Sequence, residues 1–304
     1  MTLFDLPSGG PSPARAAGRP ARGAPPAPGR TRVALGLAYD GSAYHGFAPQ
    51  PGIRTVGGDL ANALGRIAGR EVEIVGAGRT DAGVHATAQV VHADFETSLL
   101  ATRHFTTGAA FEELTRLRRS LDAQLGDAAS CWRAVVVPGA LHARFAATAR
   151  FYRYEIDVGG PFDPRRRHFA WRHEGPLDLA VMRLATDPLI GEHDFAAFCR
   201  RPPDRPDGPL VRRVLFARWA TAPGRLAFEI AANAFCHQMV RAIVGTLVAA
   251  GAGRRRASDV VALLHSGSRC GAPPLAPAAG LCLVGVGYPE DLGGWWGDSP
   301  APAG

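Results

Sequence analysis

Residues 71–95 read EVEIVGAGRTDAGVHATAQVVHADF, and the rest of the chain can be laid out from them. Residues 71–75 and 88–95 have the apolar, β-branched character of strands. Between them, residues 76–85 are polar and contain glycine, which indicates a loop. Loops held by rigid strands are where catalytic groups concentrate, so this loop is the first candidate for a functional site.

Strands and helices alternate on both sides of this segment. In the first half of the chain, apolar periodicity predicts a strand over 32–39 and helices over 56–67 and 111–125. In the second half, the same periodicities predict strands over 151–157, 211–220, 225–232 and 281–288, and helices over 178–189, 235–247 and 258–267. Strands that can pair antiparallel, together with one-sided helices in both parts, predict an α+β fold of two similar halves.

Composition divides the chain into a folded body and two tails. Residues 1–30 contain seven Pro and five Gly, so they bury little apolar surface and are predicted to be a disordered tail. Residues 290–304 are also rich in Gly and Pro and form a predicted C-terminal tail. The body then consists of an N-terminal half at 31–145, which contains the loop 78–86, and a C-terminal half at 146–289.

Charge and hydropathy narrow the class of protein. The 304 residues include 34 basic and 27 acidic side chains, a net charge of +7 that favours a polyanionic partner such as nucleic acid. Charge alone leaves a solvated basic surface equally open. A hydrophobic content of 46% is ordinary for a globular protein and excludes a fully disordered or collagen-like chain.

Cysteine usage and hydropathy predict a cytoplasmic protein. Five cysteines, an odd number without C-x-x-C spacing, argue against a disulfide framework or a zinc ribbon and fit a reducing compartment. The N-terminus lacks the apolar core of a secretory signal. The longest mostly apolar run, residues 242–253, is too short to span a bilayer.

The loop Gly78-Arg79-Thr80-Asp81-Ala82-Gly83-Val84-His85-Ala86 concentrates reactive side chains. Asp81 is a candidate nucleophile, general base or metal ligand, and Arg79 can bind a phosphate or orient a carboxylate. Composition leaves a second interpretation open, in which the segment is a plain hairpin turn. Asp81 would then bond its own backbone, and His85 would be a core residue.

This loop resembles the active-site loop of the TruA family of tRNA pseudouridine synthases, Gly-Arg-Thr-Asp-x-Gly-Val-His. Further segments are similar to the other motifs of the family, in the same order and at similar spacing, and the resemblance extends over about residues 32–289. The segments are YDGSAYHGF at 39–47, HARFAATARFYRY at 142–154, LIGEHDF at 189–195, NAFCHQMVR at 233–241 and GLCLVGVGYP at 280–289.

The resemblance implies the pseudouridine synthase fold, with a mostly antiparallel sheet covered by helices in each half and the active-site cleft between them. The implied reaction converts uridine to pseudouridine without a cofactor or a metal. Asp81 takes the position of the catalytic nucleophile, and Tyr152 that of the aromatic residue that stacks on the uracil. Arg241 takes the position of the arginine that orients the aspartate.

The predicted surroundings of Arg241 agree with that role. Arg241 lies on an otherwise apolar predicted helix, four residues after His237, so both should share one helix face. A charged residue on an apolar helix needs a partner, and Asp81 is the natural candidate.

The resemblance also implies tRNA as substrate and a homodimer in which one tRNA lies across both subunits. The targets would be uridines 38, 39 and 40 of the anticodon stem-loop, reached mainly through shape and phosphate contacts. The residues expected to contact RNA are Tyr44, Arg79, His85, Arg144 and Arg150, with Arg54, Arg165, Arg166, Arg167 and Arg254 to Arg256 as further candidates for phosphate contact.

Two other functions stay open at this stage. The family's glutamines are replaced by Ala48 and Gly57, and its Asn-x-x-Leu-Pro segment by residues 122–126, which is compatible with a non-catalytic RNA-binding paralogue or a different RNA target. A metal-dependent hydrolase built on Asp81 and His85 is the other alternative, although no pair of histidines has ligand spacing.

Overall fold

The computed structural model describes residues 23–100, 113–161, 163–201, 208–267 and 275–297. Most of the predicted N-terminal tail, residues 1–22, lies outside the described residues, as do residues 298–304 of the predicted C-terminal tail. Residues 290–297, which composition assigns to that tail, include a strand that pairs with the sheet.

Within the described residues, eleven strands form one sheet that runs through both halves of the chain. The main path has the order β4-β1-β3-β10-β5-β9-β8-β7. These strands are β1 (Arg30–Tyr39), β3 (His85–Glu96), β4 (Ala129–Val136), β5 (Ala149–Val158), β7 (Gly191–Asp194), β8 (Val211–Ala222), β9 (Arg225–Ala232) and β10 (Leu281–Gly287). Three short strands lie off this path: β2 (Ile74–Gly76) pairs with β3, β6 (Trp171–His173) with β5, and β11 (Trp295–Gly297) with β10.

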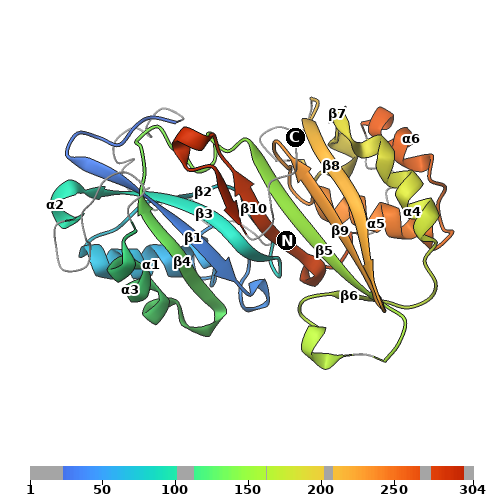
Figure 1. Ribbon diagram of the computed structural model, residues 1–304, viewed down its shortest axis with the longest axis horizontal. Coiled ribbons are helices and arrows are strands. Elements are labelled where there is room, and N and C mark those ends of the chain that lie inside the picture. Colours follow the sequence, from blue (N-terminus) through green and yellow to red (C-terminus); the bar gives the residue numbers. More distant parts are fainter. Residues whose placement is uncertain (1–22, 101–112, 162, 202–207, 268–274, 298–304) are drawn as a thin grey trace, which may run out of the picture.

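The seam between the two halves is made by β10, which comes last in the sequence among the strands of the main path but lies in the middle of the sheet. It pairs antiparallel with β5 of the second half and parallel with the start of β3 of the first half. In the parallel pairing, Cys282 lies opposite His85 and Leu283 opposite Ala86. Figure 1 shows β10 running between β3 and β5 in the middle of the molecule. The candidate loop leads into β3 at this seam, so the fold places it where the halves meet.

Helices pack against each half of the sheet (Figure 1). The first half carries α1 (Val56–Ala68), α2 (Thr97–Leu100) and α3 (Thr115–Leu125), and the second half carries α4 (Leu179–Thr186), α5 (Met239–Gly251) and α6 (Asp259–Ser266). The α+β class and the mostly antiparallel sheet expected from the sequence are confirmed.

The first helix agrees closely with its prediction because its ends carry strong local signals. Thr55 caps α1, since its hydroxyl accepts a hydrogen bond from the backbone N–H of Gly58. Gly69 ends it in the left-handed conformation, with φ at 69°.

Helix α5 begins later than predicted, and the difference matters for the site. The spacing of apolar residues predicts a helix from residue 235, but α5 starts at Met239. The reason is Gln238, which takes a left-handed conformation with φ at 66°. His237 therefore precedes the helix, and the prediction that it shares a helix face with Arg241 is wrong. Every residue of α5 except Arg241 is buried.

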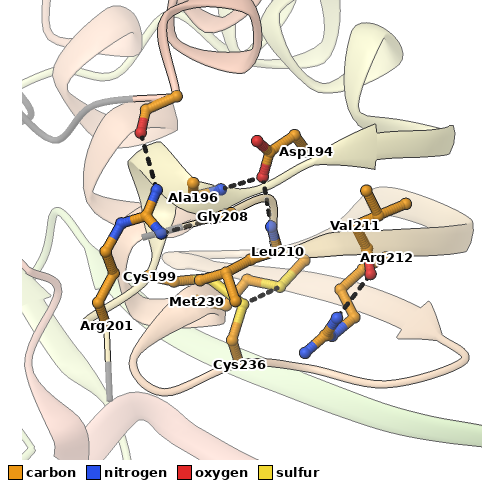
Figure 2. Close-up of a disulfide and its surroundings, with 11 residues drawn as sticks. Asp194, Ala196, Cys199, Arg201, Gly208, Leu210, Val211, Arg212, Cys236 and Met239 are labelled. Atoms are coloured by element: carbon orange, nitrogen blue, oxygen red, sulfur yellow. Dashed lines mark hydrogen bonds between the residues drawn. A yellow bond between two sulfur atoms is a disulfide. The ribbon is translucent and has the colours of Figure 1, made fainter. Parts of the chain in front are cut away.

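The structure also contains a disulfide, so the prediction from cysteine usage is wrong for one pair. Cys199 and Cys236 are bonded, with their Cα atoms 5.8 Å apart, within the usual range for such bonds (Figure 2). The two residues are 37 positions apart, so no short cysteine spacing in the sequence indicates that they pair. The bond connects the end of a short 3-10 helix, Ala196–Phe198, to the segment before α5. Cys131 and Cys282 are not part of a disulfide.

No helix among the described residues is long and apolar enough to cross a membrane.

Candidate active site

The candidate loop is fastened at the seam by hydrogen bonds from three separate segments. The side-chain amide of Gln89 donates to the carbonyl of Gly78 at 3.1 Å. The hydroxyls of Tyr39 and Thr80 are hydrogen-bonded at 2.9 Å, and the backbone N–H of Phe47 donates to the carbonyl of Thr80 at 3.1 Å. The residues just before Asp81 are thereby tied to β1, to β3 and to the segment of Phe47, which limits how far the side chain of Asp81 can move.

Close backbone packing explains two of the glycines in the motif at residues 39–47. A Cβ atom on Gly41 would lie 2.0 Å from the carbonyl oxygen of Val84, so only glycine fits there. Gly46 has φ at 97°, and a Cβ there would lie 3.0 Å from the carbonyl oxygen of Thr80. The motif at residues 39–47 is therefore the support against which the candidate loop packs.

The carboxylate of Asp81 is held at both oxygens. Nη1 of Arg241 donates to Oδ2 at 3.1 Å, and Nε2 of His237 lies 3.2 Å from Oδ1. The side chain of Asp81 is 20% exposed and that of Arg241 17%, so this ion pair is partly shielded from solvent. The side chain of His237 is 49% exposed and lies on the more open side. The arrangement presents an oriented carboxylate that a ligand can reach.

Arg241 is itself held in place by a loop from the end of the chain. Its Nε donates to the carbonyl of Ala276 at 2.8 Å, and its own carbonyl accepts the N–H of Ala276 at 3.1 Å. A guanidinium donates through a rigid planar fork, so fixing one edge on Ala276 also fixes the edge that faces Asp81.

Tyr152 lies beside this carboxylate, on β5. Its ring contacts that of Phe235 edge to face, with the centroids 5.0 Å apart. Its hydroxyl lies next to Gly78 in the candidate loop. Burial raises the pKa of Tyr152, and the charge of Asp81 raises it further, so the phenol stays protonated and can donate a hydrogen bond.

Three of the residues expected to contact RNA differ in their exposure. Arg79 and Arg144 are exposed, and the guanidinium of Arg144 lies 5.7 Å from the ring centroid of Phe145. Tyr44 is buried, with the guanidinium of Arg54 4.7 Å above its ring. Burial makes Tyr44 a poor candidate for RNA contact, while the two arginines are accessible to a ligand.

Arg150 has a different environment from the one that the sequence predicts. It is 7% exposed, and its guanidinium donates to four backbone carbonyls. Two of these acceptors are the carbonyls of Ala77, at 3.0 Å, and Asn233, at 2.7 Å. Arg150 thus connects the base of the candidate loop to the segment before α5. This burial favours a structural role over the expected RNA contact.

His85 is also placed away from the carboxylate. It is 4% exposed, and its Nδ1 accepts a hydrogen bond from the backbone N–H of Gly41 at 3.0 Å. It lines a cavity of about 710 Å³ together with Asp40 and Phe169, and Asp81 does not line that cavity. Burial lowers the pKa of His85, which keeps the ring neutral. The structure therefore does not bring His85 into the same site as Asp81.

The group at Asp81 is suited to acid–base or nucleophilic chemistry at a polar ligand. An ionised, oriented carboxylate can attack an electrophilic carbon or accept a proton without a second reactant. Among the described residues, no group of three His, Cys, Asp or Glu side chains is arranged to hold a metal ion. His237 is the member that the sequence did not single out as a site residue. Its one sequence signal is its position four residues before Arg241.

Comparison with known proteins identifies the family. A family model described as tRNA pseudouridine synthase matches residues 185–289. The tRNA pseudouridine synthase A of Frankia casuarinae is 41% identical over 266 residues, covering 86% of this chain and 91% of its own. That of Methylococcus capsulatus is 42% identical over 266 residues, with the same two coverages. That of Shouchella clausii is 38% identical over 263 residues, covering 86% and 95%. The family indicated by the motifs is confirmed: the chain belongs to the tRNA pseudouridine synthase A family.

Proposed function

We propose that this protein is an isomerase that converts uridine to pseudouridine in tRNA, with Asp81 as the nucleophile. The observation that carries the proposal is the contact pattern of Asp81, whose two carboxylate oxygens lie against Arg241 and His237. That geometry occurs in the loop where the family motif is intact, at the seam of the two halves.

The reaction breaks the bond between N1 of uracil and C1′ of ribose, turns the base, and joins C5 to C1′. Attack on the ribose or on the base requires an ionised carboxylate that is held in one orientation. The guanidinium of Arg241, through its contact with Oδ2, holds the Asp81 carboxylate in one orientation. No redox change occurs, so the proposed chemistry calls for no cofactor and no metal.

Tyr152 is proposed to stack on the uracil once the nucleotide has left the helix stack. Enzymes that modify a base commonly extrude the target nucleotide into a pocket, where aromatic side chains replace the lost stacking. The position of Tyr152 on β5, with its hydroxyl next to Gly78 in the Asp81 loop, supports this role.

The proposed substrate is the anticodon stem-loop, with uridines 38, 39 and 40 as targets. Support comes from family membership and from the net charge of +7, which favours binding to a polyanion. Arg79 and Arg144 are exposed near the loop and are the proposed phosphate contacts. We further propose that the protein acts in the cytoplasm as a homodimer, with one tRNA across both subunits, as the family implies.

The function can be tested with tRNA transcripts labelled with tritium at C5 of uridine, because pseudouridine formation releases that hydrogen. Release from a wild-type transcript is expected, and it should disappear when uridines 38, 39 and 40 are replaced by cytidine. A transcript with three uridines replaced in the acceptor stem is the matched control. Binding without release from any transcript would instead support a non-catalytic RNA-binding protein. Light scattering of the purified protein tests the dimer.

A further inference from the structure

We propose that His237 is a positioning residue for the reaction: it fixes the orientation of the Asp81 carboxylate from the side opposite Arg241. The inference rests on the proposed role of Asp81 as nucleophile. It is carried by the contact of Nε2 with Oδ1, at 3.2 Å, and by the way in which the segment around His237 is tied down.

A carboxylate with one partner is not fully oriented. Rotation about the terminal torsion of an aspartate is soft, so a single hydrogen bond leaves a broad range of carboxylate planes. Arg241 occupies Oδ2 at 3.1 Å. A second donor at Oδ1 removes the remaining freedom and sets the direction in which the carboxylate faces a substrate. His237 is placed to be that donor when Nε2 carries a proton.

The exposure of His237 separates this role from a structural one. Its side chain is 49% exposed, whereas that of Arg241 is 17% exposed. An exposed pair of this kind contributes little to folding stability. The contact between His237 and Asp81 is therefore not required to stabilise the fold. Its effect is on the orientation of the Asp81 carboxylate.

The backbone around His237 is fixed on both sides. The backbone N–H of Arg200 donates to the carbonyl of His237 at 2.9 Å. The preceding residue, Cys236, is bonded to Cys199, and its sulfur also lies 3.8 Å from that of Met239 (Figure 2). A histidine on a freely moving loop could not orient another group, so these restraints are what make a positioning role possible.

The following residue adds a third restraint. Gln238 is the one non-glycine residue with positive φ among the described residues. Such conformations persist where the surrounding structure enforces them, and they cluster at functional sites. The left-handed turn at Gln238 separates His237 from the helix that carries Arg241, yet both side chains reach Asp81. Arg150 then connects this segment, at Asn233, to the base of the Asp81 loop at Ala77.

The test compares two substitutions that differ in their ability to donate. His237→Met fills a similar volume without a donor, whereas His237→Gln retains an N–H donor at a similar reach. Both are measured by tritium release, with kcat and KM determined separately and the thermal midpoint recorded. We expect His237→Met to lower kcat by about 10- to 100-fold, the range that a small misplacement of a reacting group produces. KM and the thermal midpoint should stay near the parent values, and His237→Gln should recover most of the lost kcat.

The control is His265→Met, which changes an exposed histidine on α6 and should have the kinetics of the parent. A parent-like kcat for His237→Met, or a kcat for His237→Gln no better than that of His237→Met, overturns the inference while the proposed function stands. A matching fall in thermal midpoint for both variants overturns it as well, because the role would then be structural. Absence of release by the parent protein overturns the proposed function, and the inference with it.

Discussion

The environment of Asp81 is assembled from residues that lie far apart in the chain. Its ion-pair partner Arg241 is 160 positions away, and the loop that fixes Arg241 contains Ala276, still nearer the C-terminus. The contact between Asp81 and Arg241 joins the two halves of the chain. The reactivity proposed for Asp81 is therefore a property of the complete fold.

The ion pair predicts the effect of removing the guanidinium. Arg241→Ala should lower tritium release by about 100-fold or more, because Asp81 loses the charged partner that orients its carboxylate. Arg183→Ala is the control, since Arg183 is an exposed arginine on the neighbouring helix α4. Circular dichroism should show both variants folded. An Arg241→Ala enzyme with more than about a tenth of the parent rate would be incompatible with this role for the guanidinium.

The sequence motifs predicted which residues make up the site, but they did not predict which of the motif residues are buried. Asp81, Tyr152 and Arg241 follow from the motifs, and the structure brings these three together. Arg150 and His85 stand in equally informative motifs, but a motif does not reveal which way a side chain faces. The structure buries both, one among backbone carbonyls and one against the backbone of Gly41.

At the scale of elements, capping residues in the sequence predict where a helix begins and ends, whereas the loops could not be predicted in this way. Thr55 and Gly69 mark the ends of α1 in the sequence itself. The segment before α5 has no such mark, because its apolar spacing continues the helical pattern through Phe235. The left-handed turn at Gln238 and the bond from Cys236 to Cys199 depend on contacts with a distant segment, which periodicity cannot register.

The disulfide predicts that this segment is sensitive to reduction. Replacing both Cys199 and Cys236 by serine should lower the free energy of unfolding by roughly 3–4 kcal/mol, from the chain entropy of a loop of this length. Since the bond adjoins His237, kcat should fall as well. The parent protein treated with dithiothreitol should match the double variant, and Cys282→Ser, which changes a cysteine outside the disulfide, serves as control. Equal melting curves for parent and double variant, with and without reductant, would contradict the prediction.

Protonation of His92, on strand β3, is expected to make the free energy of unfolding depend on pH. Burial lowers the pKa of His92 to about 3, with the charge of Arg32 as a further cause, and its Nδ1 accepts the N–H of Ala143 at 3.1 Å. The unfolded chain binds a proton at this group near pH 6.5, whereas the folded chain does not. The stability contributed by neutral His92 is therefore present above about pH 6.5 and is lost as the pH falls below it.

The expected loss is roughly 2 kcal/mol between pH 6.5 and pH 4.5 from this group alone. Thermal melting over that range should show a flatter pH dependence for His92→Asn, which keeps an acceptor for Ala143 without a titrating ring. His265→Asn, at an exposed histidine, should leave the slope of the parent unchanged. Parallel curves for His92→Asn and the parent would show that another group causes the acid sensitivity.

At the scale of the whole molecule, one sheet carries both halves, and the site lies where they join. The alternation of strands and helices in both halves could be predicted because each element has its own periodicity. The parallel pairing of β10 with β3 could not be predicted from periodicity, since β10 is nearly 200 residues away from its partner in sequence. That pairing places the Asp81 loop beside β5, which carries Tyr152, and so converts two similar halves into one site.

The central claim is that Asp81 is the nucleophile, and it is tested most directly by comparing the parent with Asp81→Asn under single-turnover conditions. The readout is tritium release from tRNA labelled at C5 of uridine, with tRNA binding and thermal melting measured in parallel. Asp187→Asn, at an exposed aspartate, is the matched control. We predict release by the parent and the control, and none by Asp81→Asn, although that variant still folds and binds tRNA. Release by Asp81→Asn within about tenfold of the parent rate would contradict the account, because an amide cannot act as the nucleophile.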